Sequence, residues 1–322
     1  MSEITLALDR YDRHVPLFLG DVPGPAGLRY KALEVGMVPP RRHGIDRHGR
    51  MLRELEFDAA EVSLASYIIA RQRGVPLTAI PVFPRRLFSQ NHIFVNRRAG
   101  IERPRDLAGR KVGLWAFQVT MSVLFKGDLK SFYGVPWEEL QWHTQFPEEM
   151  PWSHPSVKLR QAQAGQDLAQ MLEAGEIDAY IHPHPPALIQ ESPNVTRLFQ
   201  DVEAECARYA EARGYFPIMH LVAIKDQRVR ERPALPRELM ALLEEGKRVA
   251  YDFYHDPGYA LLAFARNQYE RQVAALGADP WTAGLEANRA NLERFIDDMV
   301  DQRLLERPVA VESLFHASVL DT

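Results

Sequence analysis

Strand-like and helix-like segments alternate along the chain as far as Ile224, and this alternation is the strongest constraint on the fold. Strands that alternate with helices indicate βαβ units and a largely parallel sheet. Beyond Ile224 only helical spacing continues, so the C-terminal segment must pack as helices against sheets made earlier. The sequence therefore predicts an α/β fold with mixed, largely parallel sheets and a helical C-terminal segment.

The expected elements follow from hydrophobic periodicity and capping signals. We expect strands at 4–9, 57–62, 77–83, 92–96, 111–115, 176–182, 194–199 and 215–224. We expect helices at 47–55, 63–73, 118–133, 167–174, 237–254, 257–276 and 284–303. Residues 145–163 are rich in proline and polar residues and are expected to form an excursion loop.

The 322 residues suffice for two domains, and 46% hydrophobic with 25% charged residues is ordinary for a globular protein. A net charge of −4 argues against a dedicated nucleic-acid partner. No stretch approaches the roughly 20 apolar residues of a membrane span, and the N-terminus lacks the pattern of a secretory signal. We therefore expect a cytoplasmic protein without a membrane partner. These features are compatible with a homo-oligomer.

Polar side chains follow several of the expected strands. The cluster Asp9–His14 comes after the first strand, and Glu61, Ser63 and Ser66 accompany the next. Ligands of open parallel sheets bind at the carboxyl ends of strands, and polar strand ends that converge form a small-molecule pocket. The alternative is a set of solvated turns whose charges face water.

Two further segments could bind an anion. Arg85 and Arg86 follow the third expected strand and could hold a carboxylate through bidentate hydrogen bonds. Gln118 and Thr120 open a helix after a strand, where free backbone N–H groups can bind an anion. The alternatives are surface arginines and an ordinary helix cap.

The histidines and the cysteine give weaker signals. His182 and His184 follow a strand and hint at a metal site, but only His220 is placed to add a further ligand. His220 ends an apolar run, where a lone histidine is usually a core residue. Cys206 has no evident base beside it, and as the single cysteine it excludes an internal disulfide. We expect neither a metal nor a cofactor.

Taken together, these residues resemble the 4,5-dihydroxyphthalate decarboxylase family, a branch of the type II periplasmic-binding-protein-like fold. The likeness extends over nearly the whole chain. Its most specific strings are Phe-Pro-Ile-Met-His and Gly-Leu-Glu-Ala-Asn-Arg. The segments that carry it are Tyr11–Arg13, Arg50–Arg53, Glu56–Asp58, Glu61–Tyr67, Ile80–Pro84, Arg86, Phe88, Val95–Asn96, Gln118, Thr120, Gly175–Asp178, Phe216–His220, Asp279–Trp281, Gly284–Arg289 and Ala310–Glu312.

The resemblance implies a two-lobed fold with the ligand in the cleft between the lobes. The first lobe is expected to be discontinuous and to comprise 1–96 and 222–322, with the second lobe, 97–221, inserted between them. The resemblance also moves His220 from a generic core position to the floor of the cleft.

The implied function is a cofactor-independent decarboxylase, a carboxy-lyase that acts on a hydroxylated aromatic (di)carboxylic acid such as 4,5-dihydroxyphthalate in phthalate degradation. That chemistry needs a proton donor over the ring carbon, an acceptor for a hydroxyl and cations for the carboxylates. We expect His220 or His92 to donate the proton, and Asp12 to orient Arg13 or a phenol. The expected substrate-binding residues are Arg13, Ser63, Ser66, Arg86, Gln118 and Thr120.

Two other functions are open at this point. A binding or sensing protein for a small anion would have the same fold, since function depends on the site rather than on the fold. A metal-dependent lyase that uses His182 and His184 is the third alternative.

Overall fold

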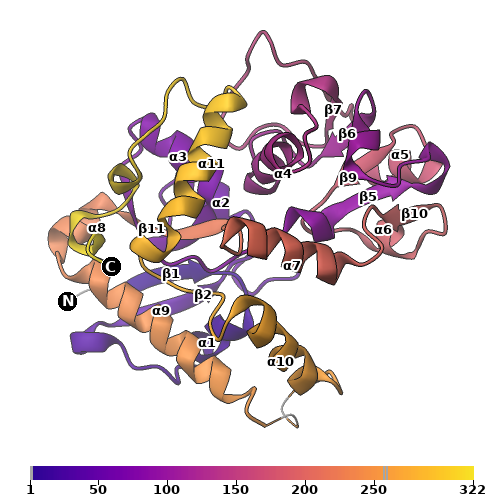
Figure 1. Cartoon of the computed structure of the whole chain (residues 1–322). Coiled ribbons are helices and arrows are strands. Elements are labelled where there is room, and N and C mark those ends of the chain that lie inside the picture. Colours follow the sequence, from indigo (N-terminus) through magenta and orange to yellow (C-terminus); the bar gives the residue numbers. More distant parts are fainter. Residues whose placement is uncertain (1–2, 257, 259) are drawn as a thin grey trace. The chain divides into compact units, whose positions relative to one another are not determined.

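The chain divides into two compact units, each built on its own β-sheet (Figure 1). The structure is a computed structural model that describes residues 3–256, 258 and 260–322. Unit 1 consists of Met1–Arg86, Ile218–Ala290 and Val309–Thr322, and unit 2 consists of Leu87–Pro217 and Asn291–Pro308. The expected first lobe was also discontinuous, but it included residues 87–96 and 291–308, and the expected second lobe, 97–221, was one continuous segment.

The sheet of unit 1 has the strand order β2-β1-β3-β11-β4. Strand β11 runs antiparallel to both of its neighbours, and β1 runs parallel to β2 and β3. Strands β3 and β4 are fully buried, as expected for a sheet covered on both faces. The strands are β1 (Ile4–Leu8), β2 (Tyr30–Glu34), β3 (Ala59–Ser63), β4 (Leu77–Ile80) and β11 (His220–Lys225).

The helices of unit 1 bury apolar residues against this sheet. The longest, α9, is amphipathic and packs on α1, on β4 and on the short turn η1 (Asp12–His14). Helix α2 packs on β3 and α3, which brings its N-terminal residues to the end of β3. The helices are α1 (Val15–Leu19), α2 (Arg47–Leu52), α3 (Leu64–Gln72), α8 (Asp226–Glu231), α9 (Leu235–Asp252) and α10 (Ala265–Leu276).

The sheet of unit 2 has the order β10-β5-β9-β6-β7-β8, with β5 antiparallel to both neighbours and the pairs from β9 to β8 parallel. A buried cluster that includes Phe94, Leu172 and Tyr180 packs α5 on this sheet. The strands are β5 (Ile93–Asn96), β6 (Lys111–Leu114), β7 (Gln141–Thr144), β8 (Leu159–Gln161), β9 (Ala179–Ile181) and β10 (Val195–Arg197). The helices are α4 (Thr120–Ser131), α5 (Leu168–Ala174), α6 (Ala187–Glu191), α7 (Val202–Arg213) and α11 (Arg289–Asp301).

The predicted α/β class with mixed sheets is confirmed, with differences at element ends. The strand expected from residue 215 begins only at His220, because Pro217 has no N–H to donate to a sheet. The expected loop 145–163 contains β8. The helix expected at 257–276 is observed at Ala265–Leu276, and residues 257 and 259 lie outside the described residues.

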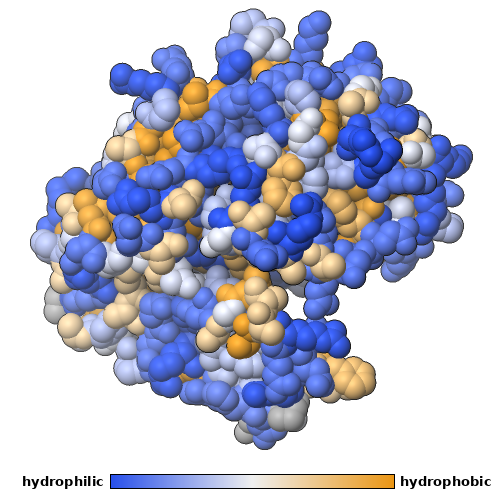
Figure 2. Space-filling model, in the orientation of Figure 1, coloured by the Kyte–Doolittle hydropathy of each residue, from blue (hydrophilic) through white to orange (hydrophobic). Residues whose placement is uncertain are grey.

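Among the described residues, no helix is both long and apolar enough to cross a membrane. The face drawn in Figure 2 is mainly hydrophilic, with smaller apolar areas between the hydrophilic ones. Large hydrophobic side chains that are exposed include Leu261, Leu262 and Phe264, between α9 and α10.

Helix α11 completes unit 2 through a close approach to α4. Arg294 donates from Nε to both carboxylate oxygens of Asp298 at 3.0 Å and from its terminal nitrogen to the backbone oxygen of Gly127 at 3.1 Å. A Cβ atom on Gly127 would overlap the Asp298 carboxylate. Gly127 is therefore required for space, since α4 has no room for a side chain where Asp298 lies.

We predict that Gly127→Ala lowers the free energy of unfolding by about 1–3 kcal/mol, because a buried and hydrogen-bonded carboxylate must move. Urea unfolding followed by circular dichroism measures the change. Gly49→Ala is the matched control in a helix of unit 1, where the atoms nearest to a new Cβ belong to the exposed side chains of Arg53 and Asp46. Equal stability of the two variants would contradict the prediction.

Candidate active site

Glu61, Ser63 and His220 lie on one face of the sheet of unit 1. Ser63 is paired directly with His220 across β3 and β11, so their side chains point to the same side. Glu61 precedes Ser63 by two residues and shares that face. Its carboxylate reaches His220 diagonally across the two strands. The sheet thus places an acid and an imidazole together without help from a loop.

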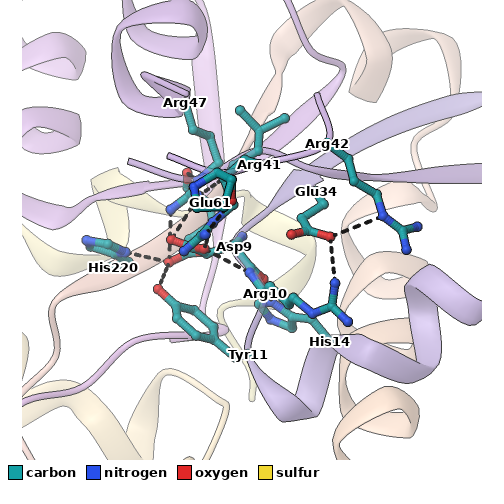
Figure 3. A network of polar contacts seen from close by, with 12 residues as sticks. Asp9, Arg10, Tyr11, His14, Glu34, Arg41, Arg42, Arg47, Glu61 and His220 are labelled. Atoms are coloured by element: carbon teal, nitrogen blue, oxygen red, sulfur yellow. Dashed lines mark hydrogen bonds and ion pairs between the residues drawn. The ribbon is translucent and has the colours of Figure 1, made fainter. Parts of the chain in front are cut away.

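The Glu61 carboxylate is the centre of a buried polar network (Figure 3). Its Oε1 accepts from Nδ1 of His220 at 2.5 Å and from the Tyr11 hydroxyl at 2.8 Å. Its Oε2 accepts from the backbone N–H of Asp9 at 3.1 Å. Figure 3 shows Tyr11, Arg47 and His220 directed at this one carboxylate from three different segments.

Arg47 supplies the positive charge that balances Glu61. Its terminal nitrogens lie 3.2 Å from Oε1 of Glu61 and 3.6 Å from Oδ2 of Asp9, and its Nε donates to the Glu61 backbone oxygen at 2.7 Å. Burial alone would raise the pKa of Glu61, but the Arg47 charge and the His220 hydrogen bond hold that pKa well below its usual range. Glu61 is therefore ionised although it is fully buried.

The imidazole of His220 is hydrogen-bonded at one ring nitrogen only. Nδ1 faces Glu61, and no hydrogen bond joins Nε2 to any of the described residues. His48 packs edge-on against the ring, with centroids 4.8 Å apart. Burial lowers the pKa of His220 to about 4, an effect that Glu61 opposes and the charges of Arg85 and Arg47 reinforce. At neutral pH His220 is thus a neutral imidazole.

Asp12 and Arg13 lie beside this network, on the turn after β1. The Arg13 guanidinium is packed between Tyr11 and Trp281, 4.3 and 3.7 Å from the ring centroids, and donates from Nε to the backbone oxygen of Pro84 at 2.9 Å. Asp12 is more exposed; it accepts from the Arg13 guanidinium and from the hydroxyl of Tyr254. Asp12 therefore contacts Arg13, one of the two groups that it was expected to orient.

The two adjacent arginines after β4 have different surroundings. A terminal nitrogen of Arg86 donates to Oδ1 of Asn288 at 2.5 Å and to the backbone oxygen of Thr282 at 3.0 Å, which fixes the segment before α11. Burial lowers the pKa of Arg86 to about 10, so it stays charged at neutral pH. The charge of Arg85, like that of Arg47, lowers the pKa of His220, and the backbone oxygen of Arg85 accepts from the N–H of His220.

The remaining predicted residues of unit 1 form a pair. The hydroxyl of Ser66, in α3, lies 3.3 Å from that of Ser63 at the N-terminus of the helix, and both are buried. Since Ser63 is paired with His220, the structure brings these two serines and His220 together.

In unit 2 the predicted anion loop already holds a carboxylate. Glu148 accepts from the backbone N–H groups of Phe117 and Gln118, both at 2.8 Å. The amide of Gln118 is also in use, since it donates to the backbone oxygen of Met150 at 2.6 Å and accepts from its N–H at 3.1 Å. Thr120 is buried at the first position of α4.

His92 lies immediately before β5, also in unit 2. Its Nδ1 is 3.2 Å from the backbone oxygen of His182, and the N–H of His182 donates to the His92 backbone oxygen. Nδ1 of His182 accepts from the backbone N–H of His184, and burial lowers the pKa of His182 to about 4. Within the described part of the chain, no group of three or more metal-ligating side chains gathers.

Comparison with known proteins identifies the family. The chain is 29% identical over 334 residues to the 4,5-dihydroxyphthalate decarboxylase of Comamonas testosteroni, covering 99% of this chain and 98% of that one. It is 30% identical over 175 residues to the enzyme of the same name from Pseudomonas putida, covering 52% of this chain and 68% of that one. The chain belongs to the 4,5-dihydroxyphthalate decarboxylase family. This membership confirms the resemblance seen in the sequence and the enzyme class, a carboxy-lyase.

The fold of this decarboxylase family member is that of periplasmic binding proteins. Residues 46–126 match the family described as NMT1/THI5 like. The aliphatic sulphonate binding protein SsuA of Escherichia coli superposes with a TM-score of 0.56 at 14% identity, covering 98% of this chain and 92% of that one. The putative SsuA of Methylobacillus flagellatus KT gives 0.58 at 9% identity, covering 100% and 93%. The predicted type II periplasmic-binding-protein-like fold is confirmed.

The predicted site of this decarboxylase family member omitted Glu61 and Arg47, although the sequence contained a signal for them. Glu61 stands inside an apolar strand, and a carboxylate buried there must be paired with a cation or hydrogen-bond donors. Its partner Arg47 opens the helix that precedes this strand. The prediction included Glu61 only as a polar strand end and did not assign it a partner.

We predict that Glu148→Ala lowers the free energy of unfolding of this decarboxylase family member by about 1–3 kcal/mol, because two backbone N–H groups lose their acceptor. Denaturant titration with a fixed m-value measures the loss. Glu139→Ala, which removes an exposed carboxylate from the same unit, serves as control and should change the stability by less than about 0.5 kcal/mol. An unchanged free energy of unfolding in Glu148→Ala would contradict the prediction. It would mean that water or another side chain accepts from both N–H groups.

Proposed function

We propose that this protein is a cofactor-independent decarboxylase of a hydroxylated aromatic carboxylic acid such as 4,5-dihydroxyphthalate. The observation that carries the proposal is the match to the Comamonas testosteroni decarboxylase over 99% of the chain. The buried Glu61–His220 pair supports it, because a histidine with one free nitrogen can move a proton during ring chemistry. The location of the substrate between the lobes stays a prediction.

Each predicted site residue has a proposed role. His220 moves a proton, and Ser63 and Ser66 contact the polar edges of the substrate beside it. Arg13, Arg86 and the neighbouring Arg85 are the cations proposed for the carboxylates. Asp12 orients Arg13, which it contacts. His92, Gln118 and Thr120 of unit 2 are proposed to contact the substrate from the second lobe.

The test is to incubate the purified full chain with hydroxylated aromatic mono- and dicarboxylic acids and to measure CO2. We expect release from 4,5-dihydroxyphthalate or a close analogue. His220→Ala should lower kcat/KM by about 10²-fold or more, the usual contribution of a positioned acid–base group. His43→Ala, an exposed histidine of the same unit, is the control and should leave kcat/KM unchanged.

Two results would contradict the proposal. Thermal stabilisation by one of these acids without CO2 release would indicate a small-anion binding protein of the same fold. CO2 release that disappears on chelation would indicate the metal-dependent alternative.

A further inference from the structure

We propose that Glu61 is a positioning residue that makes His220 the proton acceptor for a ring hydroxyl of the substrate. The inference rests on the decarboxylase function proposed above and specifies the direction in which the proton moves. The sequence had suggested the opposite direction, with His220 as the proton donor to the ring.

The first step of the argument is that Glu61 can only accept. The Asp9 backbone N–H and the Arg47 guanidinium are donors without acceptor capacity, and both face the carboxylate. Protonation of Glu61 would place a hydrogen atom among groups that are already directed at its oxygens. The carboxylate is therefore ionised, and the Nδ1 of His220, 2.5 Å from Oε1, carries the proton between them.

The second step concerns the other ring nitrogen. With the proton on Nδ1, a neutral imidazole has its lone pair on Nε2, and Nε2 has no hydrogen-bond partner among the described residues. Nε2 is then a base, and the Glu61 carboxylate stabilises the imidazolium that forms when it takes a proton. A carboxylate that orients a histidine in this way is a general device of acid–base catalysis.

The third step is that the surroundings disfavour a resting imidazolium. The titratable groups that face His220 are Glu61 from β3, Arg47 and His48 from α2, and Arg85 after β4. Only Glu61 favours the charged ring, and burial together with the two arginines opposes it. Because its pKa is about 4, His220 is a neutral imidazole at neutral pH. Before the substrate reacts, its Nε2 therefore carries no proton that it could donate.

The reaction step balances as follows. Nε2 takes the proton of a ring hydroxyl, and the oxygen keeps the electron pair. That pair is delocalised to the ring carbon that bears the carboxylate, which takes a proton from solvent. The carbon–carbon bond to the carboxylate breaks, its electrons restore the aromatic ring and CO2 leaves. The imidazolium returns its proton to the oxygen, so each turnover consumes one solvent proton.

This direction restricts the substrate class. A phenolate oxygen delocalises charge only to the ring positions ortho and para to it. The substrate must therefore carry a hydroxyl ortho or para to the carboxylate that leaves. In 4,5-dihydroxyphthalate each carboxylate has a hydroxyl para to it. A hydroxyl that is only meta, or a methoxy group in its place, should permit binding without CO2 release.

The decisive experiment compares kcat and KM of Glu61→Gln and Glu61→Asp on 4,5-dihydroxyphthalate. We expect Glu61→Gln to lower kcat by about 10²-fold with a KM within a few-fold, since a neutral amide stabilises the imidazolium poorly. Glu61→Asp, which keeps the charge, should recover part of kcat. Asp58→Asn is the matched control. It removes a buried carboxylate that precedes the same strand and accepts hydrogen bonds from Thr5 and Arg228, and it should leave kcat unchanged.

A measurement on the unaltered protein applies even if Glu61→Gln does not fold. Nitrogen-15 NMR of the full chain at pH 7 should show His220 with a protonated Nδ1 and an unprotonated Nε2. A protonated Nε2, or an unchanged kcat in folded Glu61→Gln, would overturn the inference while the decarboxylase function stands. Absence of CO2 release from every acid by the unaltered protein would instead overturn the proposed function, and this inference with it.

Discussion

The negative charge of Glu61, fully removed from solvent, is the interaction on which the rest of unit 1 depends. An ionised carboxylate in a protein interior is costly unless it is paired and fully hydrogen-bonded. The groups that satisfy it come from the turn after β1, from the start of α2 and from β11. Four chain segments are thereby held in one arrangement, and loss of Arg47 would leave a buried negative charge without its balancing cation.

The same arrangement gives His220 its chemical character. The sheet alone would make this residue a buried histidine next to two serines. Glu61 selects which nitrogen carries the proton, and the arginines keep the ring neutral until a proton arrives. The buried charge that is costly for folding is therefore the same charge that sets the protonation of His220. Ionisable groups with shifted pKa values commonly gather at functional sites in this way.

The sequence predicted many helices and strands because caps and hydrophobic periodicity lie within the segment that they specify. Helix α3 follows a serine at its cap and was predicted to within one residue at each end, and the short apolar run of β4 was predicted to begin where it does. Strands β2, β7 and β8 were not predicted, since they are short and partly polar and are specified by their neighbours in the sheet. Family membership and fold were readable for a different reason, from strings such as Phe216–His220.

The candidate site was predictable as a set of strand ends but not as a set of contacts. His220 and Glu61 are 159 residues apart, and their contact exists only because β11 pairs with β3 in one register. Glu148 likewise reaches the N–H groups of Phe117 and Gln118 from a loop without regular spacing. Long-range pairing of this kind has no periodic signature in the sequence.

The discontinuous units have a consequence for biosynthesis. Unit 2 needs α11, in which Arg294 and Asp298 contact α4. Unit 1 needs the segment that follows, where the backbone oxygen of Leu314 accepts from the Tyr67 hydroxyl and residue 322 accepts from the N–H of Leu285. Domains generally fold as they emerge from the ribosome, N-terminal first. Here neither unit is complete until residues 291–322 have been synthesised, so neither core can be finished from the N-terminal part of the chain alone.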